Sequence, residues 1–224
     1  MAEININKVV SKLDAIVDRR LRAFILADIL ISSSKEEITE FLEEIINLAL
    51  RDDEKSKEIL FSFIDLVEGT FSFEFEDTLN KLILDIETSN RTLKLILFPP
   101  SPHRFLKRGE VRVTDIMMDY LPLGVKRSFA KKMDKNLIRR MLSEKDPFVI
   151  KHLLVNPLIT EKDVLKIASS RPNQAEVIKV VYESEKWVKN YKVKEALIKN
   201  PYSPFRIALL LLFSMCKKDL VQIR

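Results

Sequence analysis

The sequence predicts an all-α fold whose second half is built from helical repeats, and three observations lead to this prediction. Only 3 of the 224 residues are glycine, and glycine supplies the backbone conformations that tight hairpins and phosphate-binding loops require. Apolar residues recur at helical spacing between capping signals along most of the chain. A short proline-containing motif recurs ahead of predicted helices in the second half.

Charge and proline content divide the chain near residue 98. Residues 1–98 carry a net charge of −8, whereas residues 99–224 carry a net charge of +13. All 9 prolines lie between Pro99 and Pro204. Because both properties change at one place, we expect an acidic N-terminal helical region, 1–98, and a basic repeat region, 99–224. The two regions either pack together or form one continuous solenoid.

The acidic region predicts five helices. Apolar residues spaced three and four apart extend from Ile4 to Ile31, which predicts one long amphipathic helix. Three serines end it, and Ser34 with Glu37, or Ser33 with Glu36, forms a capping box for a second helix that extends to about Leu50. The other three cover about residues 54–67, 74–87 and 91–98. The segment Phe71–Phe75 alternates like a strand, but no second strand is predicted to pair with it.

The basic region contains a recurring motif. Pro99-Pro-Ser-Pro-His-Arg-Phe105 and Pro201-Tyr-Ser-Pro-Phe-Arg-Ile207 share proline, serine and arginine at the same offsets, and Asn156-Pro-Leu-Ile-Thr-Glu161 opens in a similar way. Proline disfavours helix for the residue before it and asparagine tolerates a left-handed cap, so each Asn-Pro ends a helix. The serine or threonine that follows caps the next helix, with Pro204 at the first helical position.

This motif resembles the helical repeats of leucine-rich-repeat-variant and HEAT-like proteins. Pro157 and Pro201 lie 44 residues apart, which is within the ~40–47 residues of HEAT and armadillo units. Pro99 and Pro157 lie 58 apart, so one unit is irregular. The resemblance covers about residues 98–224. It implies an α-solenoid of HEAT/armadillo-like repeats with a concave binding surface, and it implies no particular activity.

No residue pattern predicts catalysis, a cofactor or a metal. The three glycines are isolated, so neither a dinucleotide-binding nor a P-loop pattern is present. One cysteine and two distant histidines, His103 and His152, do not form a zinc-ligand cluster, and we expect both histidines at the surface or a groove edge. The paired carboxylates lie on polar helical faces that solvent would cover. We therefore expect a protein that is not an enzyme, with no catalytic, cofactor-binding or metal-binding residue.

Cysteine content and hydropathy place the chain in the cytoplasm. A single cysteine, Cys216, cannot form an internal disulfide, and we expect it to be buried as a small apolar residue. The most apolar stretches, Ala23–Ile31 and Ile207–Cys216, are shorter than the ~18 residues of a membrane span. Residues Met1–Lys12 lack the pattern of a secretory signal. We expect no membrane association.

The basic stretch Lys126–Arg140 carries the most functional information. If one helix spans it, cations stand four apart along one side, and like charges so placed repel unless an anion meets them. The only acid in the stretch, Asp134, would break this stripe if it capped a new helix, and a solvated face is the alternative. The candidate anion-binding or partner-binding residues are Arg127, Lys131, Lys132, Lys135, Arg139 and Arg140.

Two classes of function fit these features. The first is a non-catalytic protein-interaction scaffold with an unidentified protein partner, which could include the chain's own acidic half. The second is a nucleic-acid-binding α-solenoid that uses the basic half, in which Trp187 or Tyr191 could stack on a base. Packing between helices is the commoner role of such an aromatic pair. HEAT-like DNA glycosylases need groove aromatics and a carboxylate, and this chain has one tryptophan and no distinguishable acid.

The last predicted helix, Pro204 to about Cys216, is apolar at nearly every position from Ile207 to Phe213. A repeat stack normally ends in a unit with a polar outer face, because an uncovered last helix exposes the core. We therefore expect another molecule to cover this end, most simply a second copy in a homodimer that uses the C-terminal helix. The alternatives are that the N-terminal half covers it or that the chain continues in a longer protein.

Overall fold

The computed structural model describes residues 6–69, 76–101, 104 and 116–221, and these residues form sixteen helices and no strand. This confirms the predicted all-α fold class. The chain divides into two compact units, residues 1–100 with 212–214 and residues 101–211 with 215–224. The segment Phe71–Phe75, His103 and most of the first proline motif lie outside the described residues.

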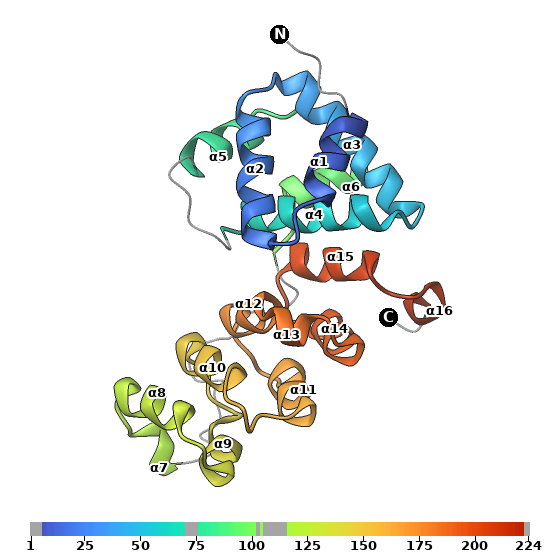
Figure 1. Ribbon diagram of the computed structural model, residues 1–224. Helices are drawn as coiled ribbons and strands as arrows, with labels where there is room; N and C mark the ends of the chain where they lie inside the picture. Colours follow the sequence, from blue (N-terminus) through green and yellow to red (C-terminus); the bar gives the residue numbers. More distant parts are fainter. Residues whose placement is uncertain (1–5, 70–75, 102–103, 105–115, 222–224) are drawn as a thin grey trace. The chain divides into compact units, whose positions relative to one another are not determined.

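The first unit is organised around a central helix. Its helices are α1 (Ile6–Asp14), α2 (Arg19–Ile31), α3 (Lys35–Leu50), α4 (Glu54–Val67), α5 (Glu76–Leu84) and α6 (Arg91–Leu97). Helix α4 lies across α1, α2 and α3 and packs against all three (Figure 1). Most of its side chains are buried, as expected for a helix surrounded by others. Even Asp65 of α4 is fully buried, and it accepts a hydrogen bond from Arg19.

The predicted helix over Ile4–Ile31 is wrong, because the segment forms two helices. The break falls at residues 15–18, where the carboxylate of Asp18 accepts from the backbone N–H of Leu21 and so caps α2. Val17 fits the apolar spacing but is 92% exposed. Later predictions in this unit are confirmed: Ser34 and Glu37 form the capping box of α3, and α4 ends just before Gly69, which has a left-handed φ of 59°.

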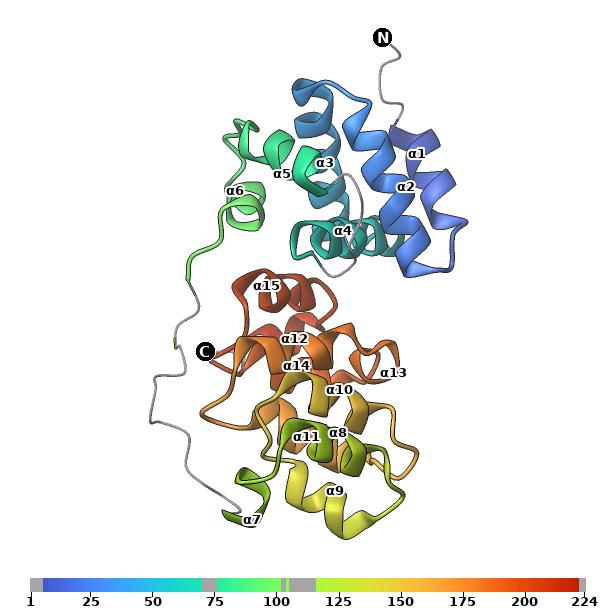
Figure 2. The ribbon, with the colours of Figure 1, turned by 90° about the vertical axis from the view of Figure 1, so that its left-hand side faces the viewer.

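The second unit consists of shorter helices. They are α7 (Ile116–Asp119), α8 (Leu123–Lys131), α9 (Lys135–Met141), α10 (Pro147–Leu154), α11 (Glu161–Ser169), α12 (Ala175–Glu183), α13 (Glu185–Val188), α14 (Tyr191–Ile198), α15 (Phe205–Phe213) and α16 (Lys217–Leu220). Helix α10 packs against α8 and α12, while α11 packs against α12 and α14. Figure 2 shows α8, α10 and α12 following one another along the unit.

A hydrogen-bond pattern recurs within the second unit at the predicted Asn-Pro sites. Asn156 follows α10 and Asn200 follows α14, and both side chains are buried. Each donates from Nδ2 to two backbone carbonyls at the end of an earlier helix, α8 or α11, at 2.7–3.2 Å. Each Oδ1 accepts from the backbone N–H two residues later. The acceptors are Ala130 and Lys132 for Asn156, and Ala168 and Ser170 for Asn200.

Two details of the predicted repeat differ from the structure. Thr160 caps α11 through a capping box as predicted, but the hydroxyl of Ser203 donates to the carbonyl of Leu197. Helix α15 begins at Phe205, so Pro204 precedes the helix and does not occupy its first position. The helix also ends at Phe213, and Cys216, predicted to be buried, is exposed.

Burial within α15 bears on the predicted use of the C-terminal helix. Leu210 and Leu211 are fully buried, whereas Leu212 and Phe213 are half-buried. The homodimer that uses the C-terminal helix stays a prediction. Across the described residues, no helix combines the length and the apolar character that crossing a membrane requires.

Candidate anion-binding surface

The basic stretch does not form one continuous helix. Helix α8 ends at Lys131 and α9 begins at Lys135, because the carboxylate of Asp134 accepts from the backbone N–H groups of Asn136 and Leu137. The single stripe of cations spaced four apart is therefore wrong. Two of its members lie on α8 and two on α9, and the alternative in which Asp134 caps a new helix is correct.

Lys126, the first cation of the stretch, has a structural partner. Lys126 is buried, and its Nζ lies 2.7 Å from Oε2 of Glu144. The other carboxylate oxygen of Glu144 accepts from the backbone N–H of Lys145, at 2.8 Å. Removing one partner of such a buried ion pair would lower the free energy of unfolding by several kcal/mol. Lys126 therefore holds the α9–α10 connection against α8 and does not contribute to a binding surface.

Arg127 is oriented by an aromatic ring and has unused hydrogen-bonding capacity. Its guanidinium lies over the ring of Phe148 on α10, 4.7 Å from the ring centroid. The nearest carboxylate oxygen, on Asp146, is 3.8 Å from a terminal nitrogen of Arg127 and already accepts from the backbone N–H of Val149. Its Nε is buried without a hydrogen-bond partner. The ring thus contacts the guanidinium, whose N–H groups donate no hydrogen bond to an acceptor among the described residues.

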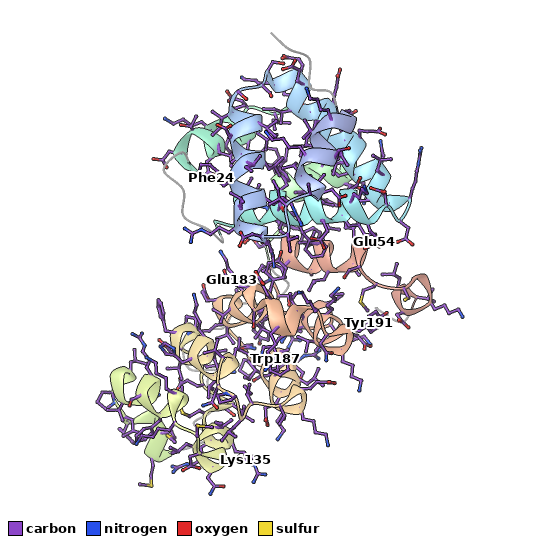
Figure 3. The ribbon with its side chains drawn as sticks, viewed as in Figure 1. Phe24, Glu54, Lys135, Glu183, Trp187 and Tyr191 are labelled. Atoms are coloured by element: carbon purple, nitrogen blue, oxygen red, sulfur yellow. The ribbon has the colours of Figure 1, made fainter. Side chains whose placement is uncertain are left out.

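The other predicted site residues lie at the surface. Lys131, Lys135 and Arg139 are exposed, and no carboxylate among the described residues forms an ion pair with any of them. Figure 3 shows Lys135 at the edge of the second unit. Lys132 is also exposed, with its Nζ 4.8 Å from the ring centroid of Phe129. Arg140 is exposed as well.

Helix α10 adds two residues to those predicted for the site. Lys151 is exposed and His152 is half-buried, on a helix that packs against α8. Burial, and then the positive charges of Lys131, Arg127 and Lys151, lower the pKa of His152. The imidazole therefore responds to cations from both helices. Together with the six predicted residues, Lys151 and His152 define the basic surface of the second unit.

The basic surface also has apolar parts. Phe148 is 59% exposed and Val155 is 74% exposed, at either end of α10. Met133, between α8 and α9, is 70% exposed. Exposed apolar side chains beside unpaired cations are typical of a surface that meets another molecule. The sequence contains these side chains as single apolar residues, but only the packing of α10 on α8 brings Phe148 into contact with Arg127.

The predicted aromatic pair does not belong to this surface. Trp187 is buried, and its Nε1 donates to the carbonyl of Leu154 at 2.9 Å. Base stacking on Trp187 is thus excluded, and the packing interpretation is correct for this residue. Tyr191 is more exposed, and its hydroxyl donates to Asp219, a residue near the C-terminus.

Lys145 makes a structural polar contact in the second unit. Lys145 donates from Nζ to the hydroxyl of Ser170 at 2.9 Å, so it joins the α9–α10 connection to the end of α11. Burial lowers the pKa of Lys145. Among the residues that the structure describes, no group of three or more histidine, cysteine or acidic side chains has an arrangement that could hold a metal ion.

Comparisons of the chain with protein-family models, with curated proteins and with solved structures find no match. The resemblance to leucine-rich-repeat-variant and HEAT-like repeats therefore stays a prediction from the sequence motif.

Proposed function

We propose that this chain is a non-catalytic protein-interaction scaffold whose basic surface binds an acidic segment of a protein partner. The observation that carries the proposal is the combination of unpaired cations with exposed apolar side chains on α8, α9 and α10. Lys131, Lys135 and Arg139 have no carboxylate partner among the described residues. Phe148 and Val155 expose apolar area on α10, which packs against α8.

This combination favours a protein over a nucleic acid. A nucleic-acid backbone is recognised mainly by cations and polar groups, and its affinity depends on the number of phosphates contacted. Aliphatic side chains such as Val155 and Met133 add nothing to such contacts. They match apolar side chains of an acidic protein segment, where burial of apolar area contributes about 25 cal/mol per Å².

The proposed architecture is a short α-solenoid of HEAT-like repeats in residues 99–224. The recurrence of the Asn156 hydrogen bonds at Asn200 supports this proposal, because each asparagine joins two consecutive helical layers in the same way. Repeat stacks of this kind present extended surfaces for binding, which suits an interaction scaffold.

Nucleic-acid binding is the second candidate, and the Arg127–Phe148 stack favours it. An exposed aromatic ring beside cations is the arrangement on which an unpaired base can stack. The two candidate functions predict different ligands and a different dependence of the affinity on salt.

Titrations with four labelled probes separate these functions. The probes are a Glu/Leu copolymer, polyglutamate, duplex DNA and single-stranded RNA, each at about 50 and about 200 mM salt. The scaffold proposal predicts that the Glu/Leu copolymer binds most tightly and that salt weakens its binding only moderately. Tightest binding of DNA or RNA, with a steep loss of affinity at high salt, would favour the second candidate. No binding to any probe at low salt would remove both.

A charge-matched pair of variants tests where the probe binds. Lys131→Gln with Arg139→Gln removes two positive charges from the basic surface. Lys162→Gln with Lys166→Gln removes two from the exposed side of α11, so the net charge changes equally. The proposal expects the first pair to weaken binding of the Glu/Leu copolymer about tenfold and the second to leave it nearly unchanged. Equal losses would mean that net charge, and not this surface, drives binding.

A further inference from the structure

Three cations of the basic surface act on the imidazole of His152. Arg127 and Lys131 come from α8, and Lys151 and His152 come from α10. These two helices pack against each other, and the three cations are close enough to His152 to influence its protonation. Like charges gathered in this way repel one another, and an anion at their centre would remove that cost.

Within this group, Arg127 is prepared to bind an oxyanion. Its guanidinium lies over the ring of Phe148, and the carboxylate of Asp146, its ion-pair partner, lies beyond hydrogen-bond distance at 3.8 Å. The terminal N–H groups therefore donate to no acceptor among the described residues. A planar, fixed guanidinium is the side chain that binds carboxylate or phosphate oxygens in a bidentate way.

On the premise that the chain is a protein-interaction scaffold, we propose that Arg127, Lys131 and His152 form a binding site for a phosphomonoester on a side chain of the partner protein. A phosphomonoester carries about −1.5 to −2 charges and three strong acceptor oxygens at neutral pH. It therefore matches a compact group of cations better than a single carboxylate does. Phe148 and Val155, on the same helix as His152, provide apolar contacts for the residues that flank the phosphate.

The layout of the charges argues against a nucleic-acid backbone at this site. A phosphodiester backbone places single charges along an extended track and is bound by cations that follow it. Here Asp134 divides the stretch between two helices, and Lys126 is held in an ion pair with Glu144. The remaining cations are divided between α9 and the place where α8 packs against α10, so they do not follow one extended track.

The site also predicts a coupling between phosphate binding and the protonation of His152. A bound dianion stabilises the imidazolium form. The pKa of His152 therefore rises from its lowered value, and the imidazole takes up a proton. The charges that act on His152 come from α8 and from Lys151 of its own helix. Helix α12, which also packs on α10, carries the charged residues Glu176, Lys179 and Glu183.

The test uses the full chain and three peptides that differ at one residue. The central residue is phosphoserine, serine or glutamate, and leucines flank it. We expect the phosphoserine peptide to bind at least about tenfold more tightly than the serine peptide, with the glutamate peptide between them. Arg127→Gln and, separately, Lys131→Gln should each remove most of that preference. Lys162→Gln, on the exposed side of α11, is the control and should preserve it.

Lys131 is exposed, so its replacement keeps the test valid even if Arg127→Gln disturbs the packing on Phe148. The chain has two histidines, so His103→Gln leaves a single imidazole for NMR titration. Its pKa should rise when the phosphoserine peptide is added, and an unchanged value would overturn the proposal.

The outcomes separate this site from the scaffold function on which it rests. Equal binding of the three peptides, with the Glu/Leu copolymer still bound through Lys131 and Arg139, would overturn the phosphate site and leave the scaffold function intact. The phosphate site would also be overturned if a single-stranded oligonucleotide displaced the labelled phosphoserine peptide at a lower concentration than the unlabelled peptide does. Failure of every protein probe would remove the scaffold function itself.

Discussion

At the scale of single residues, Asn156 and Asn200 each join the ends of two helices of the second unit. Each is buried and donates to two carbonyls that would otherwise lack a partner at the end of a helix. Replacing Asn156 with alanine leaves both carbonyls unsatisfied. We expect the free energy of unfolding to fall by about 2–4 kcal/mol.

Urea denaturation followed by circular dichroism measures this loss. Asn136→Ala, at an exposed position of α9, is the matched control and should change the free energy of unfolding by less than about 0.5 kcal/mol. A loss for Asn156→Ala as small as that of the control would show that the hydrogen bonds from this side chain contribute little.

The sequence predicted these asparagines only as helix ends. An Asn-Pro pair stops a helix through local backbone preferences, which any short window of sequence contains. The carbonyls that accept from Asn156 lie 24 and 26 residues earlier, and nothing in the local pattern points to them. The same limit applies to Lys126, since a basic stretch does not reveal which of its members pairs with Glu144.

At the scale of helices, capping residues decided which predictions succeeded. Ser34 and Glu37 lie where apolar periodicity begins, so the start of α3 was predicted correctly. Asp18 and Asp134 lie inside stretches of continuous pattern, and each starts a new helix there. Periodicity extends across such a break because residues on both sides still face a core or solvent. An aspartate within a periodic run is the signal that indicated a possible break at Asp134, and the same signal could have located the break at Asp18.

The cap of α4 gives a prediction about pH. The Ser56 side chain close to Asp53 and the hydrogen bond that the backbone N–H of Ser56 donates to its carboxylate hold the pKa of Asp53 below its ordinary value. Asp53 therefore contributes stability above the unfolded-state value of 3.8, and this contribution is lost as pH falls through the folded-state pKa. Asparagine is an equally good cap but does not titrate in this range.

Unfolding of the wild type and Asp53→Asn between pH 5 and pH 2.5 tests this prediction. Below about pH 4 we expect the free energy of unfolding to fall more steeply for the wild type than for the variant. The stability of the variant relative to the wild type therefore increases as pH falls. Parallel curves across this range would show that the charge of Asp53 does not contribute to the stability of α4.

At the scale of the whole molecule, the main property is the opposite charge of its two parts, −8 for residues 1–98 and +13 for residues 99–224. Composition alone established this division, and periodicity established that the fold is all-α. The basic surface itself depends on α10 packing against α8, which brings His152 and Phe148 beside Arg127. That contact joins residues about 20 positions apart in the chain, so no local pattern predicts it.

Chemical-shift mapping of the Glu/Leu copolymer on the isotopically labelled chain tests the central claim most directly. The backbone amide signals that move on titration should belong to residues 123–155, with Lys131, Lys151 and His152 among the most affected. Signals of α1 to α6 should stay in place. Shifts spread evenly over all exposed lysines, or confined to residues outside 123–155, would contradict the assignment of binding to this surface.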